Sequence, residues 1–196
     1  MASLFNTLQT GAFRAGVQAR TRKSSQWFER KVKELGDVSP RTVLKDKALD
    51  PTTKPQIGDM MMYFYDPKTK ATLPYYDRFP LTIMVQPAKG GFHGLNLHYL
   101  SPRVRAQFLD ELMELAPKKM TDSTRLTKMR YKLLTGVAKY KEFQPCYKHY
   151  LMGHVASRMS RVPMPEWEIA VFLPTEQFMK VKKESVWRYS RKQYAG

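Results

Sequence analysis

The residues that could carry catalysis in this chain of 196 residues are three aspartates near two lysines. Asp59, Asp66 and Asp77 follow one another closely, with Lys68 and Lys70 between them. Carboxylates that share a metal ion beside a lysine are what a metal-dependent nuclease requires. Two of these residues have a simpler role, because Asp66 precedes a proline in an expected turn and Asp77 precedes an arginine. A nuclease is therefore kept as an alternative.

The four histidines do not predict a metal site. They form two pairs, His93 with His98 and His149 with His154, each five positions apart. That spacing directs the rings to opposite faces of a strand, and about 140° apart on a helix. The single cysteine, Cys146, cannot complete a site and excludes an internal disulfide. We expect His98 and Cys146 to be buried core residues.

Motifs that would indicate an enzyme are absent from the sequence. It contains no phosphate-binding loop that ends in Gly-Lys-Ser or Gly-Lys-Thr, no G-x-G-x-x-G motif and no G-x-S-x-G elbow. The glycine-rich stretch at Gly90–Gly94 is typical of a hairpin turn. We therefore expect a protein without catalytic activity that needs no metal or other cofactor.

The strongest signal is the formal net charge of +17. Residues 58–117 hold equal numbers of basic and acidic side chains. Residues 1–57 hold eleven basic against five acidic, and residues 118–196 hold seventeen against six. Because surplus like charge repels itself in a folded protein, its presence indicates a partner of opposite charge. Nucleic acid is the first such partner, and an anionic membrane surface or an acidic protein is the alternative. No run approaches the roughly eighteen apolar residues of a membrane span.

The elements that must position these charges begin with a sheet. Proline, glycine and aspartate divide residues 58–100 into short apolar runs that are typical of strands. Lys89-Gly90-Gly91 should close a hairpin, since glycine reaches positive φ without steric cost. We expect strands at 60–65, 81–86, 94–99 and 168–173. These elements predict an α+β fold, with a small antiparallel sheet or a partly open β barrel, several packed helices and a basic N-terminal helical arm.

Apolar residues that recur every three or four positions predict helices around this sheet. The expected helices cover 2–20, Ser24 or Ser25 to Leu35, Pro102 to the residue before Pro117, 123–141, 146–159, and a last helix capped by Thr175. Residues 37–57 read as a linker with one helical turn at 41–47. We therefore divide the chain into a basic helical arm and linker, 1–57, and a core domain, 58–196. The acid-free stretch before Glu29 also fits a mitochondrial presequence, and we favour the arm.

Three basic segments are predicted to contact DNA phosphates. In the arm these are Arg20, Arg22, Lys23, Arg30 and Lys31. On the helix at 123–141, four cations fall within a sector of about 60° that contains no acid, namely Arg125, Lys128, Lys132 and Lys139. For any one of them a solvated surface is the simpler interpretation.

The third segment is the C-terminal helix, where basic and aromatic residues alternate. Cations there can meet phosphates, and the ring of Trp187 can stack on bases. The basic residues are Lys182, Lys183, Arg188, Arg191 and Lys192. The structural alternative is a terminal helix with Trp187 docked on the body of the protein.

Several phrases of the sequence resemble a known family. They are YFYDPKTKATLPYYDRFPLTIMV with GGFHGLNLHYL, and later EWEIAVFLPTEQF. The family is the DNA end protector, or head-completion protein, of T-even-type tailed phages and their cyanophage relatives. The similar blocks cover residues 58–102 and 163–190, and more loosely 24–35.

The resemblance implies a minor virion protein of the head or neck, which reaches the host cytoplasm after injection and during assembly. It would bind the ends of packaged linear double-stranded DNA, protect them from host exonuclease and complete the head beside portal or neck proteins. That role requires sequence-independent phosphate binding and no catalytic centre, in agreement with the charge. The alternatives are a structural neck, tail or baseplate protein, and a metal-dependent nuclease.

Overall fold

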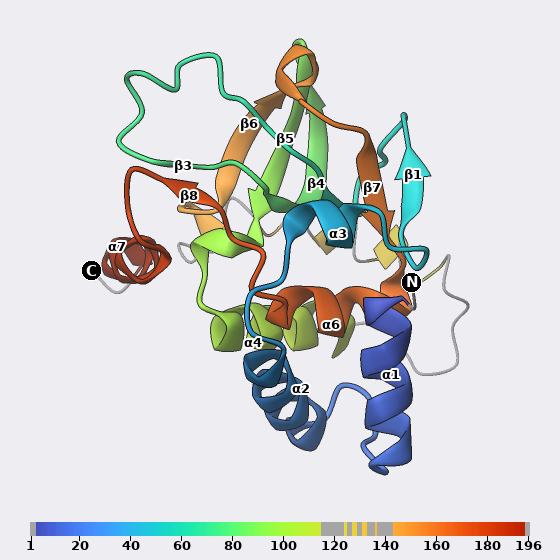
Figure 1. Ribbon diagram of the computed structural model, residues 1–196. Helices are drawn as coiled ribbons and strands as arrows, with labels where there is room; N and C mark the ends of the chain where they lie inside the picture. The colour runs from blue at the N-terminus through green and yellow to red at the C-terminus, as the bar shows by residue number, and fades with distance from the viewer. Residues whose placement is uncertain are drawn as a thin grey trace.

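The computed structural model describes residues 3–114, 124, 127–128, 131–132, 136 and 143–194 (Figure 1). Its centre is a six-stranded antiparallel sheet in the order β1-β7-β2-β4-β5-β6. The strands are β1 (Asp50–Thr52), β2 (Met60–Met62), β4 (Leu81–Ala88), β5 (Gly91–Asn96), β6 (Tyr147–Leu151) and β7 (Met159–Val162). Because β1 and β6 lie at opposite edges, the sheet is open and not a closed barrel. A separate ribbon pairs β3 (Tyr76–Asp77) with β8 (Phe178–Met179).

Helices surround the lower end of this sheet, which confirms the predicted α+β class. In Figure 1, α4 and α6 lie below the sheet, α1 and α2 form a further layer beneath them, and α7 runs along one side. The helices are α1 (Leu4–Arg14), α2 (Arg22–Leu35), α3 (Pro40–Leu44), α4 (Pro102–Glu114), α6 (Trp167–Phe172) and α7 (Lys183–Tyr194). None of the helices among the described residues is both long enough and apolar enough to cross a membrane.

Strand β2 is buried on both sides, and its alternation separates two clusters. Met60, Met61 and Met62 are all fully buried. Because successive side chains of a strand point to opposite faces, Met60 and Met62 join the main core with the helices. Met61 instead joins a second, aromatic cluster that includes Tyr63 and Tyr150. Tyr65 and Tyr150 of this second cluster also line a cavity.

The hairpin at Lys89-Gly90-Gly91 is confirmed. Ala88 and Gly91 are paired in register, and Gly90 adopts a φ of 73°. A Cβ atom on Gly91 would lie 1.8 Å from the carbonyl oxygen of Tyr150, so only glycine fits there. The strand that follows is shifted from its predicted position, because β5 ends at Asn96 and residues 97–99 form the 3-10 turn η1 (Leu97–Tyr99).

Two predicted elements are wrong in type. Residues 146–159 form no helix, since they make β6, the 3-10 turn η3 (Met152–His154) and the start of β7. Pro145 and Gly153 bracket a tyrosine-rich run that pairs with β5, and this tertiary pairing outweighs the helical pattern. The expected strand at 168–173 is helix α6, whose six residues are all buried. A short apolar run does not distinguish a buried strand from a buried helix.

Capping residues also differ from the predicted ones. Helix α2 begins with Thr21 as its N-cap, and Ser24 completes a reciprocal capping box with it. Thr175 caps no helix. It is buried between α6 and β8, with its Oγ1 3.3 Å from Nε2 of His98. The final helix begins later, at Lys183.

The first 57 residues pack against the rest of the protein. Side chains of α1, α2 and α3 belong to the same buried cluster as the sheet, and the ring of Phe28 stacks on Phe172 of α6 at 6.4 Å. Asp46 accepts hydrogen bonds from the Ser3 hydroxyl and the Leu4 amide, both at 2.6 Å, which secures the start of α1. The predicted linker contains β1, paired with β7. The division at residue 57 remains a prediction.

Candidate nucleic-acid interface

Helix α7 presents a basic outer face. Its inner side buries Val186 and Ser190. Arg188, Arg191 and Lys192 are exposed, and at about 100° per residue they share a sector of about 100°. Glu184 lies in the same sector one turn earlier. Within the described part of the chain, no ion pair joins any of these cations to a carboxylate. Lys182 is exposed just before the helix.

The inner side of α7 holds the helix on the protein. Trp187 donates a hydrogen bond from Nε1 to the carbonyl oxygen of His98 at 2.9 Å, so its ring is docked as in the structural alternative. The Lys183 ammonium lies 3.6 Å from the buried carboxylate of Glu176. Their present contacts fix the orientation of the outer face, and contact of either residue with DNA remains a prediction.

Arg105 is the fully buried residue around which this region is organised. Its Nε donates to the carbonyl oxygens of Leu97 at 2.9 Å and Leu100 at 2.8 Å. Its guanidinium also forms an ion pair with Glu176 and lies 5.8 Å from the centre of the Trp187 ring. Burial raises the pKa of Glu176, but Arg105, His98 and Lys183 outweigh it and lower the pKa to about 2. A charged pair thus anchors α7.

An aromatic contact links α7 to the loop at residues 66–75. Tyr189 is exposed on α7, and its ring stacks on Tyr75 with centroids 6.1 Å apart and an interplanar angle of 26°. Beyond Tyr75 lies a cavity of about 400 Å³ lined by tyrosines and by Lys148 of β6. We did not predict Lys148 or Tyr75 as functional residues. The only signal for them in the sequence was the density of tyrosine, which is equally typical of a buried core.

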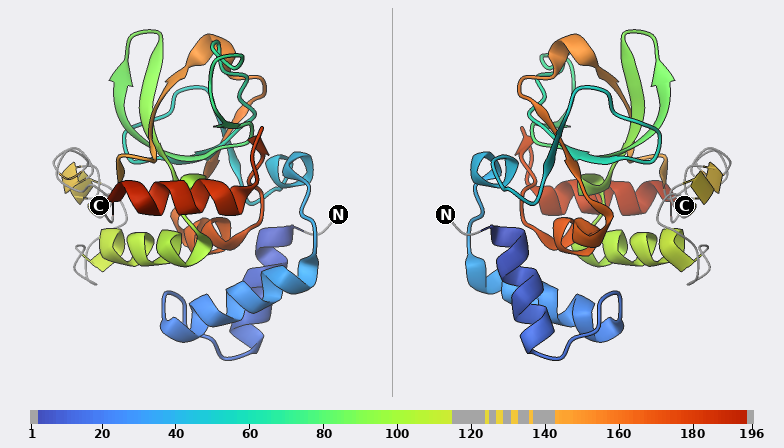
Figure 2. Two further views of the ribbon diagram at one scale, coloured as in Figure 1. Left: turned by 90° about the vertical axis from the view of Figure 1, so that its left-hand side faces the viewer. Right: turned by 90° about the vertical axis from the view of Figure 1, so that its right-hand side faces the viewer.

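The basic residues of α2 form a separate surface. Arg22, Lys23 and Arg30 are exposed, whereas Lys31 pairs with Glu34 at 2.6 Å. Figure 2 shows α4 between α2 and α7 on the side where α7 faces the viewer. The exposed side of α4 carries Asp110 and Glu111 together with Arg103. The basic faces of α2 and α7 are therefore separated by a helix that carries acidic residues.

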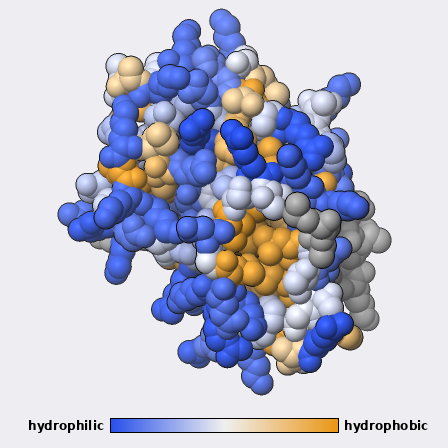
Figure 3. Space-filling model, in the orientation of Figure 1, coloured by the Kyte–Doolittle hydropathy of each residue, from blue (hydrophilic) through white to orange (hydrophobic). Residues whose placement is uncertain are grey.

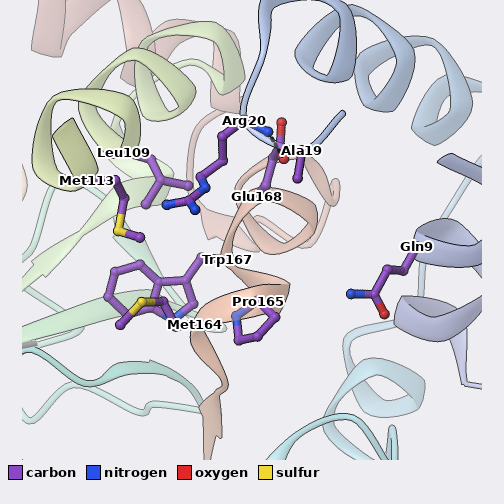
Figure 4. Close-up of a pocket in the computed structure, with 9 residues that line it drawn as sticks. All are labelled: Gln9, Ala19, Arg20, Leu109, Met113, Met164, Pro165, Trp167 and Glu168. Atoms are coloured by element: carbon purple, nitrogen blue, oxygen red, sulfur yellow. Dashed lines mark hydrogen bonds between the residues drawn. The ribbon is translucent and has the colours of Figure 1, made fainter. Parts of the chain in front are cut away.

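Arg20 differs from the other predicted cations of the arm. It has a positive φ of 57°, and its backbone N–H donates to Glu168 at 2.8 Å. Figure 4 shows its side chain extending into a cavity of about 240 Å³ between Leu109 and Trp167. Burial raises the pKa of Glu168, and hydrogen bonds from Ser24 and from the backbone of Arg20 oppose that rise. Arg20 thus lies where the arm meets α4 and α6.

The predicted stripe on residues 123–141 is described only in part. Lys128 and Lys132 are helical, Lys128 is exposed and Lys132 is half-buried. Arg125 and Lys139 lie outside the described residues. The predicted alignment of all four therefore remains a prediction.

The three aspartates of the nuclease alternative have separate structural contacts. Asp59 accepts a hydrogen bond from the Gln56 amide at 2.8 Å, and Asp66 pairs with Lys70 at 2.8 Å. Asp77 is buried and lies 2.7 Å from Nδ1 of His98. Over the described ranges, no three histidine, cysteine or acidic side chains are grouped so that they could hold a metal ion. His98 is confirmed as a buried histidine, and burial raises the pKa of the buried Cys146 to about 12.

Comparison with protein families gives a match along nearly the whole chain. The family model described as phage T4 terminal DNA protecting protein matches residues 2–194. Neither curated proteins nor solved structures give a match. Since far more than half of the chain is matched, the protein belongs to the phage T4 terminal DNA protecting protein family.

Proposed function

We propose that this protein binds the ends of linear double-stranded DNA and shields them from exonuclease, without catalysing a reaction. The observation that carries the proposal is the outer face of α7, where Arg188, Arg191 and Lys192 are exposed and free of ion pairs among the described residues. The family description supports DNA termini as the target. The formal net charge of +17 favours a polyanion of any sequence.

The proposed mechanism is electrostatic binding followed by steric exclusion. Cations on a rigid helix neutralise phosphates and release condensed counterions, which gives affinity without base readout. The buried Arg105–Glu176 pair and the docked Trp187 hold α7 in place. A protein fixed on the last turns of a duplex denies an exonuclease access to the terminus, and this requires no chemistry.

The test is protection of a linear duplex from a processive exonuclease over a salt series. We expect full-length DNA to persist at about 50 mM salt and protection to fall steeply toward about 200 mM. Closed circular DNA should compete poorly for the protein. Degradation at the same rate with and without the protein at low salt would contradict the proposal. Mg²⁺-dependent cutting by the protein itself would favour a nuclease.

We also propose that the protein completes the phage head and there contacts portal or neck proteins, so that it lies in the virion and later in the host cytoplasm. Figure 3 shows a hydrophobic area in the lower half of the view, with hydrophilic residues on its left. Phe13 of α1 is 83% exposed, so its ring is available to contact a protein partner. Sedimentation with purified portal and neck proteins tests this part. A stoichiometric complex together with negligible DNA affinity would favour a purely structural neck, tail or baseplate protein.

A further inference from the structure

The cavity beside α7 has the size and walls of a small-molecule site. Its volume of about 400 Å³ lies within the range of roughly 300–1,000 Å³ that is typical of ligand pockets. The loop at 66–75 forms one wall and β6 forms another. We call it the tyrosine cavity, because five tyrosines line it: Tyr65, Tyr75, Tyr76, Tyr99 and Tyr150.

Two of the tyrosine rings are held in place by packing in the second cluster. Tyr65 and Tyr150 belong to the second cluster and lie 4.9 Å apart, edge to face. Burial raises the pKa of both hydroxyls, so both remain neutral at ordinary pH. Tyr75 and Tyr76 are half-buried and belong to the outer wall. Fixed aromatic faces suit a planar ring, and every nucleobase offers one.

Lys148 adds a cation that has no anionic partner. Its Nζ lies 4.4 Å from the centre of the Tyr99 ring, and the side chain is half-buried. No carboxylate of the described residues lies within ion-pair distance of it. Asp77, the one acid of the cavity wall, is already bonded to His98, Asn96 and two backbone amides. Burial lowers the pKa of Lys148, and an anion beside it would remove that penalty.

The outer wall is fastened by an unusual lysine. Lys180 has a φ of 72°. Its ammonium donates to three carbonyl oxygens of the loop, those of Lys70 at 2.8 Å, Ala71 at 3.1 Å and Leu73 at 2.6 Å. This arrangement holds the loop over the cavity. Since Tyr75 also stacks on Tyr189 of α7, the cavity and the basic face adjoin.

A second cavity, which adjoins the tyrosine cavity, is more basic. It has a volume of about 590 Å³ and shares Tyr65 and Tyr76 with the tyrosine cavity. Arg41 and Arg78 contribute cations to it, whereas Lys70 is paired with Asp66 of the same wall. Cations close to aromatic rings match a nucleic-acid strand, in which charged phosphates alternate with planar bases.

We propose that the tyrosine cavity receives the terminal nucleotide of a DNA strand, with its base against the tyrosines and a phosphate against Lys148. This inference rests on the proposed function and deepens it, because it gives the protein a means to recognise an end. Only at a terminus can a base leave the stack without disrupting pairs on both sides. Phosphate contacts along α7 would bind any duplex, whereas the cavity would select the end.

The test compares wild type with Lys148→Met on two DNA molecules of one sequence, a linear duplex with a short 5′-phosphorylated overhang and its closed circle. Methionine keeps the length of the side chain and removes the unpaired charge, so the fold should persist. We expect affinity for the linear form to fall about tenfold, and affinity for the circle to change less than about twofold. Lys54→Met is the matched control, because Lys54 is exposed beside β1, at the edge of the sheet opposite β6.

The outcomes separate the two proposals. One outcome is that wild type prefers linear DNA and Lys148→Met has the same affinity as wild type for both forms. This would refute the role of the cavity and leave the proposed function intact. Equal losses on both forms also overturn it, since Lys148 would then be a general phosphate contact. Wild type without any preference for linear DNA contradicts the proposed function itself.

If Lys148→Met proves unfolded by circular dichroism, Tyr76→Leu replaces it with the same expectations. Binding of free thymidine 5′-monophosphate as tight as binding of the overhang assigns the cavity to free nucleotides and overturns the inference.

Discussion

At the scale of the residue, the best-defined feature is the buried ion pair under α7. Arg105 reads in the sequence as one more cation of a basic chain, yet it is fully buried and bonded to four backbone carbonyl oxygens. Burying a charge is unfavourable unless it is paired, so the partner Glu176 is essential to the arrangement. The pair contributes nothing to DNA contact directly. It determines where the exposed cations of α7 point.

The lowered pKa of Glu176 predicts a specific loss of stability in acid. A carboxyl whose pKa falls from 4.5 to about 2 on folding stabilises the protein above pH 4.5 and loses that contribution as the pH falls toward 2. The loss should be about 3 kcal/mol of unfolding free energy. Glu176→Gln should lack this pH dependence and be less stable near pH 7 by about 3–5 kcal/mol, because it leaves Arg105 unpaired.

Denaturant unfolding at pH 7, 5 and 3 measures both effects. Glu184→Gln is the control, since Glu184 is exposed on the same helix and forms no ion pair with a described residue. If the difference in unfolding free energy between wild type and Glu176→Gln stays constant from pH 7 to pH 3, the ion pair does not account for the loss of stability in acid.

At the scale of the element, α7 and the loop at 66–75 act together, and α2 stands apart. The outer face of α7 carries three exposed cations, and its inner face is anchored by Trp187 and Lys183. The exposed cations of α2 lie beyond α4 (Figure 2). If the cavity marks the place of the DNA end, α7 contributes most of the phosphate contacts near it.

Replacing Arg188, Arg191 and Lys192 together by Gln should therefore reduce the salt dependence of DNA binding. Removing one phosphate-binding cation lowers the slope of log affinity against log salt by about 0.9, so we expect a reduction of up to about 3 for the triple variant. Fluorescence anisotropy on a linear duplex measures the slope. The control is the triple change of Lys45, Lys47 and Lys54 to Gln, which removes the same charge from exposed positions elsewhere. Equal slopes for the two triple variants would refute a special role for α7.

The hydrogen bonds of Lys180 are expected to keep the loop at 66–75 ordered. Lys180→Met removes a donor to three carbonyl oxygens, and hydrogen bonds to a charged group stabilise more than neutral ones. Amide hydrogen exchange across residues 66–75 should become at least about tenfold faster. Lys182→Met is the control, because Lys182 is exposed and makes no contact of this kind. Unchanged exchange in Lys180→Met would mean that other contacts hold the loop.

Sequence patterns predicted the elements that depend on local signals. The hairpin at Gly90, the start of α4 at Pro102 and the amphipathic α2 follow from turn chemistry, capping and helical periodicity. The misassigned segments depend on tertiary partners. The run at 147–151 becomes a strand because β5 offers it an edge, whereas 167–172 is a buried helix that packs among α1, α2 and α4. The basic residues of α7 were predicted, but Lys148 was not, since its cavity joins segments distant in the chain.

At the scale of the whole molecule, the arm and the core share one buried cluster. Phe5, Leu8, Trp27 and Phe28 of the arm pack with residues of the sheet and of α6. Glu168 of α6 accepts hydrogen bonds at the start of α2, where the positive end of the helix dipole favours a carboxylate. These contacts suggest that the basic surfaces are carried on one cooperative unit.

Phe28→Ala tests that cooperativity. Removal of a buried phenylalanine should lower the unfolding free energy by about 3–5 kcal/mol, and the whole protein should still unfold in one transition. Tryptophan fluorescence, which includes Trp27 in the arm, and far-ultraviolet circular dichroism should give coincident curves. Phe13→Ala, at a site 83% exposed, should change stability by less than about 0.5 kcal/mol. An early, separate fluorescence transition would instead support an independent arm at residues 1–57.

The most direct measurement of the central claim is the affinity of the purified protein for linear and closed circular duplexes of one sequence, across a salt series. We expect tight binding at low salt that weakens steeply as salt rises, together with a clear preference for the linear form. Affinity that is weak at low salt, or the same for both forms, would contradict a role in binding DNA ends.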